Sequence, residues 1–403
     1  MKGKRFAFGE AIRLAVRGFH YGRSRIVEIQ ANKHMNKVFI APGRYVQGRN
    51  ALNEAGVLVG ALGKRVMTLW DAQVKGIVGE TLLASLHGAG LGVEDVVFNG
   101  DSTRAEAARV AQIIRERKVD VIMGVGGGKT LDTAKAAAAA AGVKVVTCPT
   151  VASNDSPTSS FTVWYDEQGN CTGFESWGTN PALVLVDTQV IAQAPVRTFV
   201  AGMGDALSTA LEAEACFKAR GPNLAGGTAT MAARTLARLC YDILMEHGLE
   251  AKRAVENKIV TPAVENVVEA NVLLSGLGFE SGGCATAHMV ANCLPSFPEC
   301  HGLMHGHEVG FGIITQLCLD DDMPVERIYR IVDFEIAIGL PVTFADLGLP
   351  GVTRERLARI GEICAGPGSL CENHPFPVTA DDIVNAMIAA DALGEERKRL
   401  RKP

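Results

Sequence analysis

The sequence has 403 residues, of which 47% are hydrophobic and 21% charged, and these proportions are typical of a globular protein. They exclude bulk disorder and a fibrous chain, and the length suggests two domains or three. The formal net charge is −4, and from Met35 onward 32 basic residues face 42 acidic ones. A body this acidic argues against a nucleic-acid-binding surface, and the lack of a long apolar run argues against a membrane span.

Residues 1–34 differ from the rest, with eight basic and two acidic residues and no long apolar core. This composition does not fit a secretory signal peptide. Three interpretations stay open: an upstream extension before a working start at Met35, an organelle transit peptide, or an ordered arm. We expect a cytoplasmic protein, with organelle targeting by residues 1–34 left open.

From Met35 onward, short runs rich in Val and Ile alternate with helical stretches. The predicted strands are Arg65–Trp70, Asp95–Phe98, Val119–Val125, Val143–Cys148 and Leu183–Val186. The predicted helices between them are Lys75–His87, Arg104–Arg117 and Thr130–Ala141, and Phe161–Tyr165 with the turn after it indicates a hairpin arm. Strands that alternate with helices of this length predict βαβ units and a mostly parallel sheet.

After about Asp187 the strand signal stops, and Pro195 to Arg401 is dominated by helical periodicity. We therefore predict three parts. Residues 1–34 are the basic extension, 35–195 an α/β domain and 196–403 an all-α domain.

A glycine-rich segment, Gly124–Asp132 (GVGGGKTLD), lies between a predicted strand and a predicted helix. Glycines at Gly126, Gly127 and Gly128 let a pyrophosphate approach the backbone, and the helix N-terminus offers it free N–H groups. Lys129 stands where a Rossmann fingerprint needs glycine, and Met123 where a Walker A loop needs glycine. The segment therefore predicts a diphosphate site of neither standard type, the alternative being a glycine-rich turn without a ligand.

Asp71 follows the strand Arg65–Trp70. An acid at this place accepts hydrogen bonds from ribose hydroxyls and repels a 2′-phosphate, which favours NAD over NADP. The alternative is an ordinary loop or helix-cap residue.

Three side chains form a candidate metal site. Asp205 is expected at the start of a helix, His288 lies in a predicted helical stretch, and His305 belongs to a group with His301 and His307. One carboxylate and two imidazoles suit Zn²⁺ or Fe²⁺ with positions left open for a substrate. The alternatives are a helix cap for Asp205 and a core histidine for His288.

Several segments together resemble one family, the glycerol dehydrogenases of the iron-containing alcohol dehydrogenase superfamily. They are Ala41–Gly48 (APGRYVQG), Gly124–Lys135 (GVGGGKTLDTAK), Pro149–Ser159 (PTVASNDSPTS), Gly202–Ala206 (GMGDA), Leu274–Gly283 (LSGLGFESGG) and His305–Gly312 (HGHEVGFG). The resemblance extends from about Met35 to the C-terminus.

The resemblance implies a dehydroquinate-synthase-like fold, with a Rossmann-like N-terminal domain, a mostly parallel sheet, an all-α C-terminal domain and a cleft between the domains. It assigns the metal to Asp205, His288 and His305, commonly zinc with iron in relatives, and a polyol contact to Asp155. It implies NAD contacts and a large homo-oligomer. The positions matched to NAD contacts are Asp71, Gly128, Lys129, Asp132, Thr150, Ser153, Ser159, Phe161 and Tyr165.

The implied activity is reversible, NAD-dependent oxidation of glycerol to dihydroxyacetone, with a small polyol as substrate. Alternatives are a related 1,2-diol or simple-alcohol dehydrogenase, a dehydroquinate-synthase-like lyase, and a non-catalytic NAD-binding protein. The stretch 284–312 holds no Lys or Arg, which disfavours a phosphate-bearing substrate.

The sequence departs from the family pattern at Asn154, at His307 and over 284–301. His307 offers an extra ligand or a proton relay, or is a variation outside the ligand shell.

Overall fold

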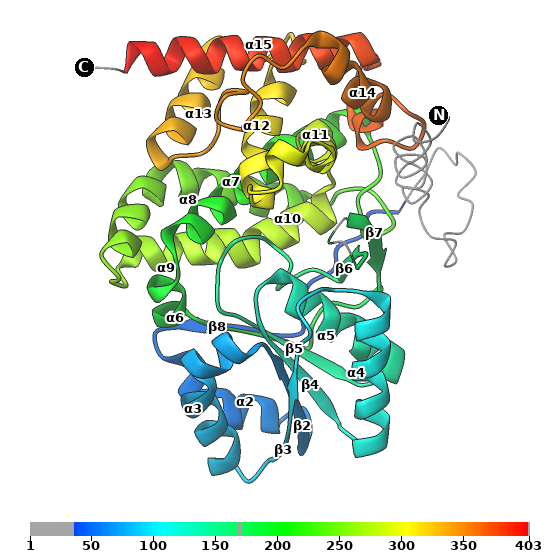
Figure 1. The fold of residues 1–403 in the computed structure, drawn as a ribbon, viewed down its shortest axis with the longest axis vertical. Coiled ribbons are helices and arrows are strands. Elements are labelled where there is room, and N and C mark those ends of the chain that lie inside the picture. Colours follow the sequence, from blue (N-terminus) through cyan, green and yellow to red (C-terminus); the bar gives the residue numbers. More distant parts are fainter. Residues whose placement is uncertain (1–35, 168, 170, 402–403) are drawn as a thin grey trace, which may run out of the picture. The chain divides into compact units, whose positions relative to one another are not determined.

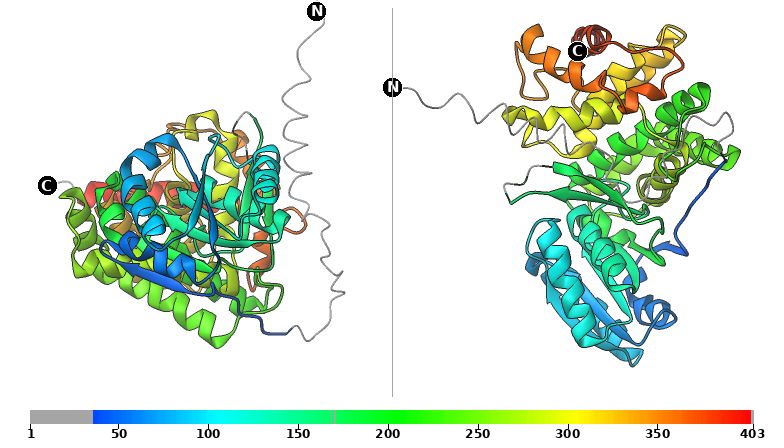
Figure 2. Two further views of the ribbon diagram at one scale, coloured as in Figure 1. Left: turned by 90° about the horizontal axis from the view of Figure 1, so that it is seen from below. Right: turned by 90° about the vertical axis from the view of Figure 1, so that its right-hand side faces the viewer.

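The computed structural model describes residues 36–401, apart from 168 and 170, so the predicted basic extension lies outside the described residues. The chain forms two compact units, shown in Figures 1 and 2. The first comprises 42–150 and 156–187, and the second comprises 36–41, 151–155 and the part from Thr188 onward. The division falls at Asp187 rather than at the predicted 195, because the short helix α6 (Thr188–Gln193) packs against helices of the second unit.

The first unit is built on a six-stranded, all-parallel sheet in the order β1-β8-β5-β4-β2-β3. Its strands are β1 (Tyr45–Gly48), β2 (Arg65–Trp70), β3 (Gly92–Val97), β4 (Val121–Gly126), β5 (Lys144–Pro149) and β8 (Leu183–Asp187). Its helices are η1 (Ala51–Glu54), α2 (Ala55–Gly60), α3 (Ala72–Gly88), α4 (Arg104–Arg117) and α5 (Gly128–Ala141). The predicted parallel α/β architecture is confirmed.

The sheet is covered on both faces, as Figure 1 shows, with α2 and α3 on one face and α4 and α5 on the other. The buried core beneath α4 and α5 includes Met67, Leu69 and Ile122 from the strands and Val110 and Ile114 from α4. Strands buried on both faces of a sheet consist of nearly continuous apolar residues, and this pattern predicted β2 and β4 from the sequence. The edge strand β3 begins at Gly92, before the predicted Asp95. The prediction missed its first residues because they are partly exposed and form no apolar run.

A separate two-stranded antiparallel hairpin, β6 (Phe161–Tyr165) and β7 (Cys171–Ser176), completes the first unit. It packs on α5. The predicted hairpin arm coincides with β6.

The second unit is helical, as predicted. Its helices are α6, α7 (Val196–Ala219), α8 (Met231–Glu256), α9 (Pro262–Glu269), the π-helix η2 (Ala270–Leu274), α10 (Ser275–Gly282), α11 (Thr286–Cys293), η3 (Leu294–Ser296), η4 (Pro298–Cys300), α12 (His305–Leu317), α13 (Val325–Ile338), α14 (Arg354–Cys364), η5 (Leu370–Asn373) and α15 (Ala380–Leu400). Among the described residues, the structure contains no helix with the length and apolarity that a bilayer crossing requires.

Helix α7 lies at the centre of this unit and packs against α8, α10 and α12. The expectation that Asp205 begins a helix is wrong, since Asp205 lies in the interior of α7. The glycines around it serve close packing between α7 and its neighbours. A Cβ at Gly202 would lie 1.8 Å from the Ala152 carbonyl oxygen, and one at Gly204 would lie 2.2 Å from that of Gly306.

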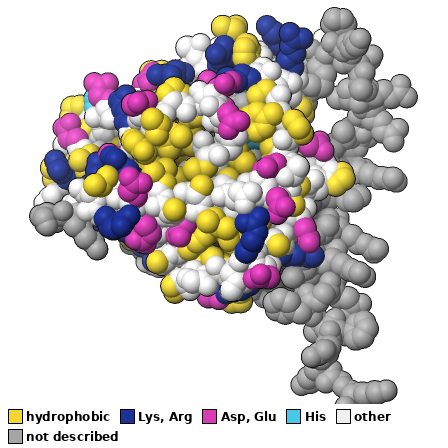
Figure 3. All heavy atoms as spheres, turned by 90° about the horizontal axis from the view of Figure 1, so that it is seen from above, with side chains coloured by type: hydrophobic (Ala, Val, Ile, Leu, Met, Phe, Trp, Pro, Cys, Tyr) yellow, Lys and Arg dark blue, Asp and Glu magenta, His cyan; other side chains and the backbone are white. Residues whose placement is uncertain are grey.

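Figure 3 shows the face that carries α13–α15. On this face, Lys and Arg side chains alternate with Asp and Glu side chains, and hydrophobic side chains gather between them. No single basic field forms on this described face.

Gly124 of β4 tests the packing that positions the glycine turn. A Cβ at Gly124 would lie 2.7 Å from the Cβ of Ala134 on α5, so Gly124→Ala should destabilise the first unit by about 1–3 kcal/mol. All three tryptophans lie in this unit, so tryptophan fluorescence during urea unfolding measures the effect.

Gly76 provides the matched control, because it lies within α3 and a Cβ there would meet no atom within 4 Å. Gly76→Ala should stabilise the same unit by about 0.5–1 kcal/mol. Equal stability of Gly124→Ala and wild type would contradict the packing argument.

Candidate metal centre and nucleotide turn

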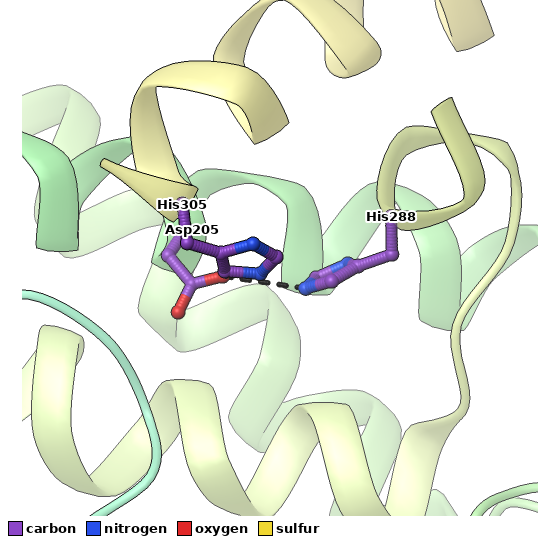
Figure 4. A group of neighbouring side chains, drawn as sticks. All are labelled: Asp205, His288 and His305. Carbon is purple, nitrogen blue, oxygen red and sulfur yellow. Dashed lines mark ion pairs between the residues drawn. The ribbon is translucent and has the colours of Figure 1, made fainter. Parts of the chain in front are cut away.

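Asp205, His288 and His305 come together in the second unit, although they lie on the three different helices α7, α11 and α12. Their nearest carboxylate and imidazole atoms all lie within 4.8 Å of one another. The His288 Nε2 atom is 3.3 Å from Asp205 Oδ1, and the His305 Nε2 atom is 3.7 Å from the same oxygen. Figure 4 shows both rings directed toward the carboxylate. The three predicted ligands thus converge.

The cluster is buried on one side and open on the other. The side chains of Asp205 and His288 keep 1% and 8% of their surface exposed, whereas His305 keeps 39%. Asp205 Oδ1 is buried, and in the described part of the chain no donor reaches it with hydrogen-bond geometry. A carboxylate oxygen in this condition, faced by two imidazole nitrogens, fits a divalent cation with an open coordination side.

Electrostatics keep the acidic groups of the cluster ionised. Burial by itself raises the pKa of Asp205, but the neighbouring imidazoles of His288 and His305 outweigh this effect, and the pKa lies below its usual value. Glu212 behaves alike, since His288 lowers its pKa against the effect of burial. Both carboxylates therefore carry a negative charge, which favours a cation beside them.

Glu212 is a site residue that sequence reasoning missed. It lies on α7 two turns after Asp205, and its Oε2 atom is 2.5 Å from His288 Nδ1. The available signal was the spacing of seven residues, which places two acids on one face of a helix.

Asp155 is brought beside the ligand carboxylate by the segment 151–155. Its backbone N–H donates to Asp205 Oδ2 at 3.2 Å. The segment is held by Asn271 of the π-helix η2, whose Nδ2 donates to the carbonyls of Ala152 at 3.1 Å and Phe199 at 3.2 Å. Asn271 was not predicted, because one amide within an apolar run carries no sequence signal. Ser153 lies in the same segment and is buried.

The glycine turn of the first unit links β4 to α5. Gly127 is the N-cap of α5 in an extended conformation, and no side chain caps the helix there. Gly126 has a φ of 153°, which favours glycine, and its carbonyl accepts the N–H of Thr150 at 3.1 Å. Uncapped N–H groups and the positive end of the helix dipole form an anion-binding feature.

The other residues matched to nucleotide contacts differ in their present partners. Asp71 is the N-cap of α3, and its Oδ1 accepts the N–H of Val74 at 2.8 Å. Lys129 pairs with Asp101, and its Nζ lies 4.4 Å from the centre of the Tyr165 ring.

Asp132 is buried and engages three groups, Lys135 at 2.8 Å, Ser156 at 2.6 Å and the N–H of Val163 at 2.9 Å. It joins α5 to β6 and to the segment that follows β5, so in this structure it shapes the turn region from within. Ser159 and Phe161 are buried in the same region.

The two other histidines of the predicted group lie outside the cluster. His301 is exposed and its Nε2 bonds the Pro295 carbonyl at 3.0 Å. His307 Nδ1 accepts the N–H of Met304 at 3.2 Å and so caps α12. A capping role explains His307 without an extra ligand or a proton relay.

Comparisons with known proteins agree with this fold. Residues 42–188 match the family model for iron-containing alcohol dehydrogenase. A glycerol dehydrogenase of Thermotoga maritima is 43% identical to this chain, in an alignment that covers 90% of this chain and 98% of the relative. A glycolaldehyde reductase of Halobacterium salinarum is 41% identical, with 89% and 98% covered. The crystal structure of glycerol dehydrogenase from Schizosaccharomyces pombe superimposes with a TM-score of 0.87 at 36% identity, covering 91% of this chain and 93% of its own.

These similarities extend over nearly the whole chain and show that the protein is an oxidoreductase. It belongs to the iron-containing alcohol dehydrogenase family. The family resemblance and fold class predicted from the sequence are confirmed.

The ligand set is tested by metal analysis. Protein purified without chelators should contain about one divalent ion per chain. Asp205→Asn and His288→Ala should lose most of it, because each removes a ligand from a three-ligand site. His301→Ala is the control, since this exposed histidine lies outside the cluster. Wild-type metal content in Asp205→Asn would contradict the assignment.

Proposed function

We propose that the protein is a reversible, NAD-dependent glycerol dehydrogenase that forms dihydroxyacetone at a metal held by Asp205, His288 and His305. The observation that carries the proposal is the convergence of these ligands around a buried carboxylate oxygen without a hydrogen-bond donor among the described residues. The similarity to glycerol dehydrogenases over most of both chains supports the substrate.

When bound, the cation supplies a Lewis acid that lowers the pKa of a coordinated hydroxyl, and NAD supplies the hydride acceptor. The chain's own residues orient the substrate and exclude water from one side. Asp205 and His288 form the buried wall, and the exposed side of His305 is the direction from which a polyol enters and a proton leaves to water. The side chain of Asp155, beside Asp205, is assigned to a terminal hydroxyl. Zinc is the proposed metal and iron the alternative.

The nucleotide is assigned to the first unit. Its diphosphate binds the uncapped N–H groups at Gly127 and Gly128, with Lys129 beside them. Asp71 uses Oδ1 for its cap, and the proposal gives the ribose hydroxyls to Oδ2. Thr150, Ser159, Phe161 and Tyr165 of this unit keep their proposed places along the nucleotide, as does Ser153 of the segment 151–155, and Asp132 supports the turn from behind. A homo-oligomer is also proposed, and analytical ultracentrifugation measures it.

A related 1,2-diol is the second candidate substrate, because the glycolaldehyde reductase of Halobacterium salinarum is 41% identical to this chain. Glycolaldehyde reduction gives a two-carbon vicinal diol. Both candidates need two adjacent hydroxyls or their carbonyl equivalents, so the same metal centre serves either reaction.

The substrate prediction is tested by NADH formation. Glycerol and 1,2-propanediol should be oxidised with a higher kcat/KM than ethanol, because two adjacent hydroxyls chelate one cation. Dialysis against a chelator should abolish activity, and Zn²⁺ or Fe²⁺ should restore it. Faster turnover of ethanol would favour a simple-alcohol dehydrogenase, and faster reduction of glycolaldehyde than of dihydroxyacetone would favour the two-carbon substrate.

The nucleotide turn is tested by Gly127→Asp. The extended N-cap conformation accepts Asp, whose carboxylate caps α5, so the fold should not lose stability. The same carboxylate should weaken NADH binding by roughly 1–4 kcal/mol through repulsion of the diphosphate. Fluorescence titration measures binding, with Gly127→Ser as the uncharged control cap. Wild-type affinity in Gly127→Asp would place the diphosphate elsewhere.

A further inference from the structure

A histidine ligates a metal through one ring nitrogen only when the proton of the neutral ring sits on the other. For His288, the nitrogen that faces Asp205 and His305 is Nε2, so the proton must stay on Nδ1. Outer partners that accept this proton set the orientation and tautomer of a ligating ring. The group that meets His288 Nδ1 is therefore part of the metal centre.

The carboxylate of Glu212 meets this nitrogen, and its two oxygens have separate tasks. Oε2 lies 2.5 Å from His288 Nδ1. Oε1 accepts the backbone N–H groups of Ala285 and His288, each at 2.9 Å. The two oxygens thus tie the His288 ring and the first turn of α11 to the same residue of α7.

The backbone contacts are needed because α11 has no cap of its own. Ala285 at its N-cap offers no side-chain acceptor. Glu212 supplies acceptors from α7, and Gln316 Oε1 of α12 accepts the N–H of Ala287 at 3.0 Å. Two side chains from two neighbouring helices therefore cap the helix that carries His288, and only one of them also touches the imidazole.

We propose that Glu212 is a positioning residue of the metal centre, which holds His288 in the tautomer that presents Nε2 to the cation. The inference rests on the proposed function in requiring a metal at Asp205, His288 and His305. A carboxylate only accepts hydrogen bonds, so it admits a ring with its proton on Nδ1 and excludes the other neutral tautomer. The thiol of Cys284 also lies within 4.8 Å of the Glu212 carboxylate and the His288 ring, but a thiol is a weaker hydrogen-bond acceptor than a carboxylate.

Glu212→Gln separates the two tasks. The backbone N–H groups require the amide oxygen at the place of Oε1, which puts the amide NH₂ against His288 Nδ1. A donor at this place drives the ring proton to Nε2, the atom that should bind the cation. Apoprotein loaded with Co²⁺ should bind about 10–100-fold more weakly than wild type in chelator competition. Its ligand-field spectrum should also change.

Gln316→Leu is the matched control. It removes an acceptor from the same helix end and leaves the imidazole untouched, so it should lower the thermal midpoint of the apoprotein. Its Co²⁺ affinity and spectrum should equal those of wild type. Equal metal loss in both variants would reduce Glu212 to a helix cap, and wild-type affinity and spectrum in Glu212→Gln would overturn the proposal.

A measurement on the wild-type protein covers the case in which Glu212→Gln does not fold. In Co²⁺-loaded protein, the ring N–H of a ligating histidine gives a shifted proton NMR signal that disappears on exchange into D₂O. The buried His288, bonded to Glu212, should give a slowly exchanging signal, and its absence would overturn the proposal.

Wild-type protein that binds Co²⁺ but oxidises no polyol would overturn the proposed function and leave the Glu212 comparison valid. Wild-type protein that binds no metal would overturn both.

Discussion

The second unit depends on one electrostatic constraint, the buried carboxylate of Asp205 in the interior of α7. Removing a charge from water costs several kcal/mol, so a buried carboxylate requires positive or donating partners close by. Two imidazoles from α11 and α12 and the backbone N–H of Asp155 supply them. These partners reach the carboxylate only because α7 carries glycines where the neighbouring backbones approach.

The same constraint organises the surroundings of the site. The close approaches at Gly202 and Gly204 bring the segment around Ala152 and the start of α12 against α7. Asn271 then fixes that segment from the π-helix, a local widening of the helical backbone often found at functional sites. Glu212 belongs to this arrangement, since it lies on the helix that bears the buried carboxylate and contacts one of the imidazoles beside that carboxylate.

The first unit depends on the uncapped N-terminus of α5, which follows the glycine turn. A helix N-terminus without a side-chain cap leaves backbone donors and a positive partial charge, and α5 has such an end at Gly127. Asp132 and Lys135 form a buried ion pair within α5, just after the glycine turn. This pair ties the start of α5 to its neighbours, so side chains outside the glycine turn hold that turn in place.

By itself, the sequence determined the parallel α/β architecture, the helical second half, the glycine turn and the identity of the three converging side chains, because each has a local signature in apolar periodicity, glycine spacing or family motif. Only the tertiary structure decided that Asp205 lies within a helix rather than at its start, that His307 caps α12, and that Asp132 is buried. It also decided that Glu212 and Asn271 belong to the site. The physical reason is that hydrogen bonds between distant helices depend on packing geometry, which leaves no periodic trace along the chain.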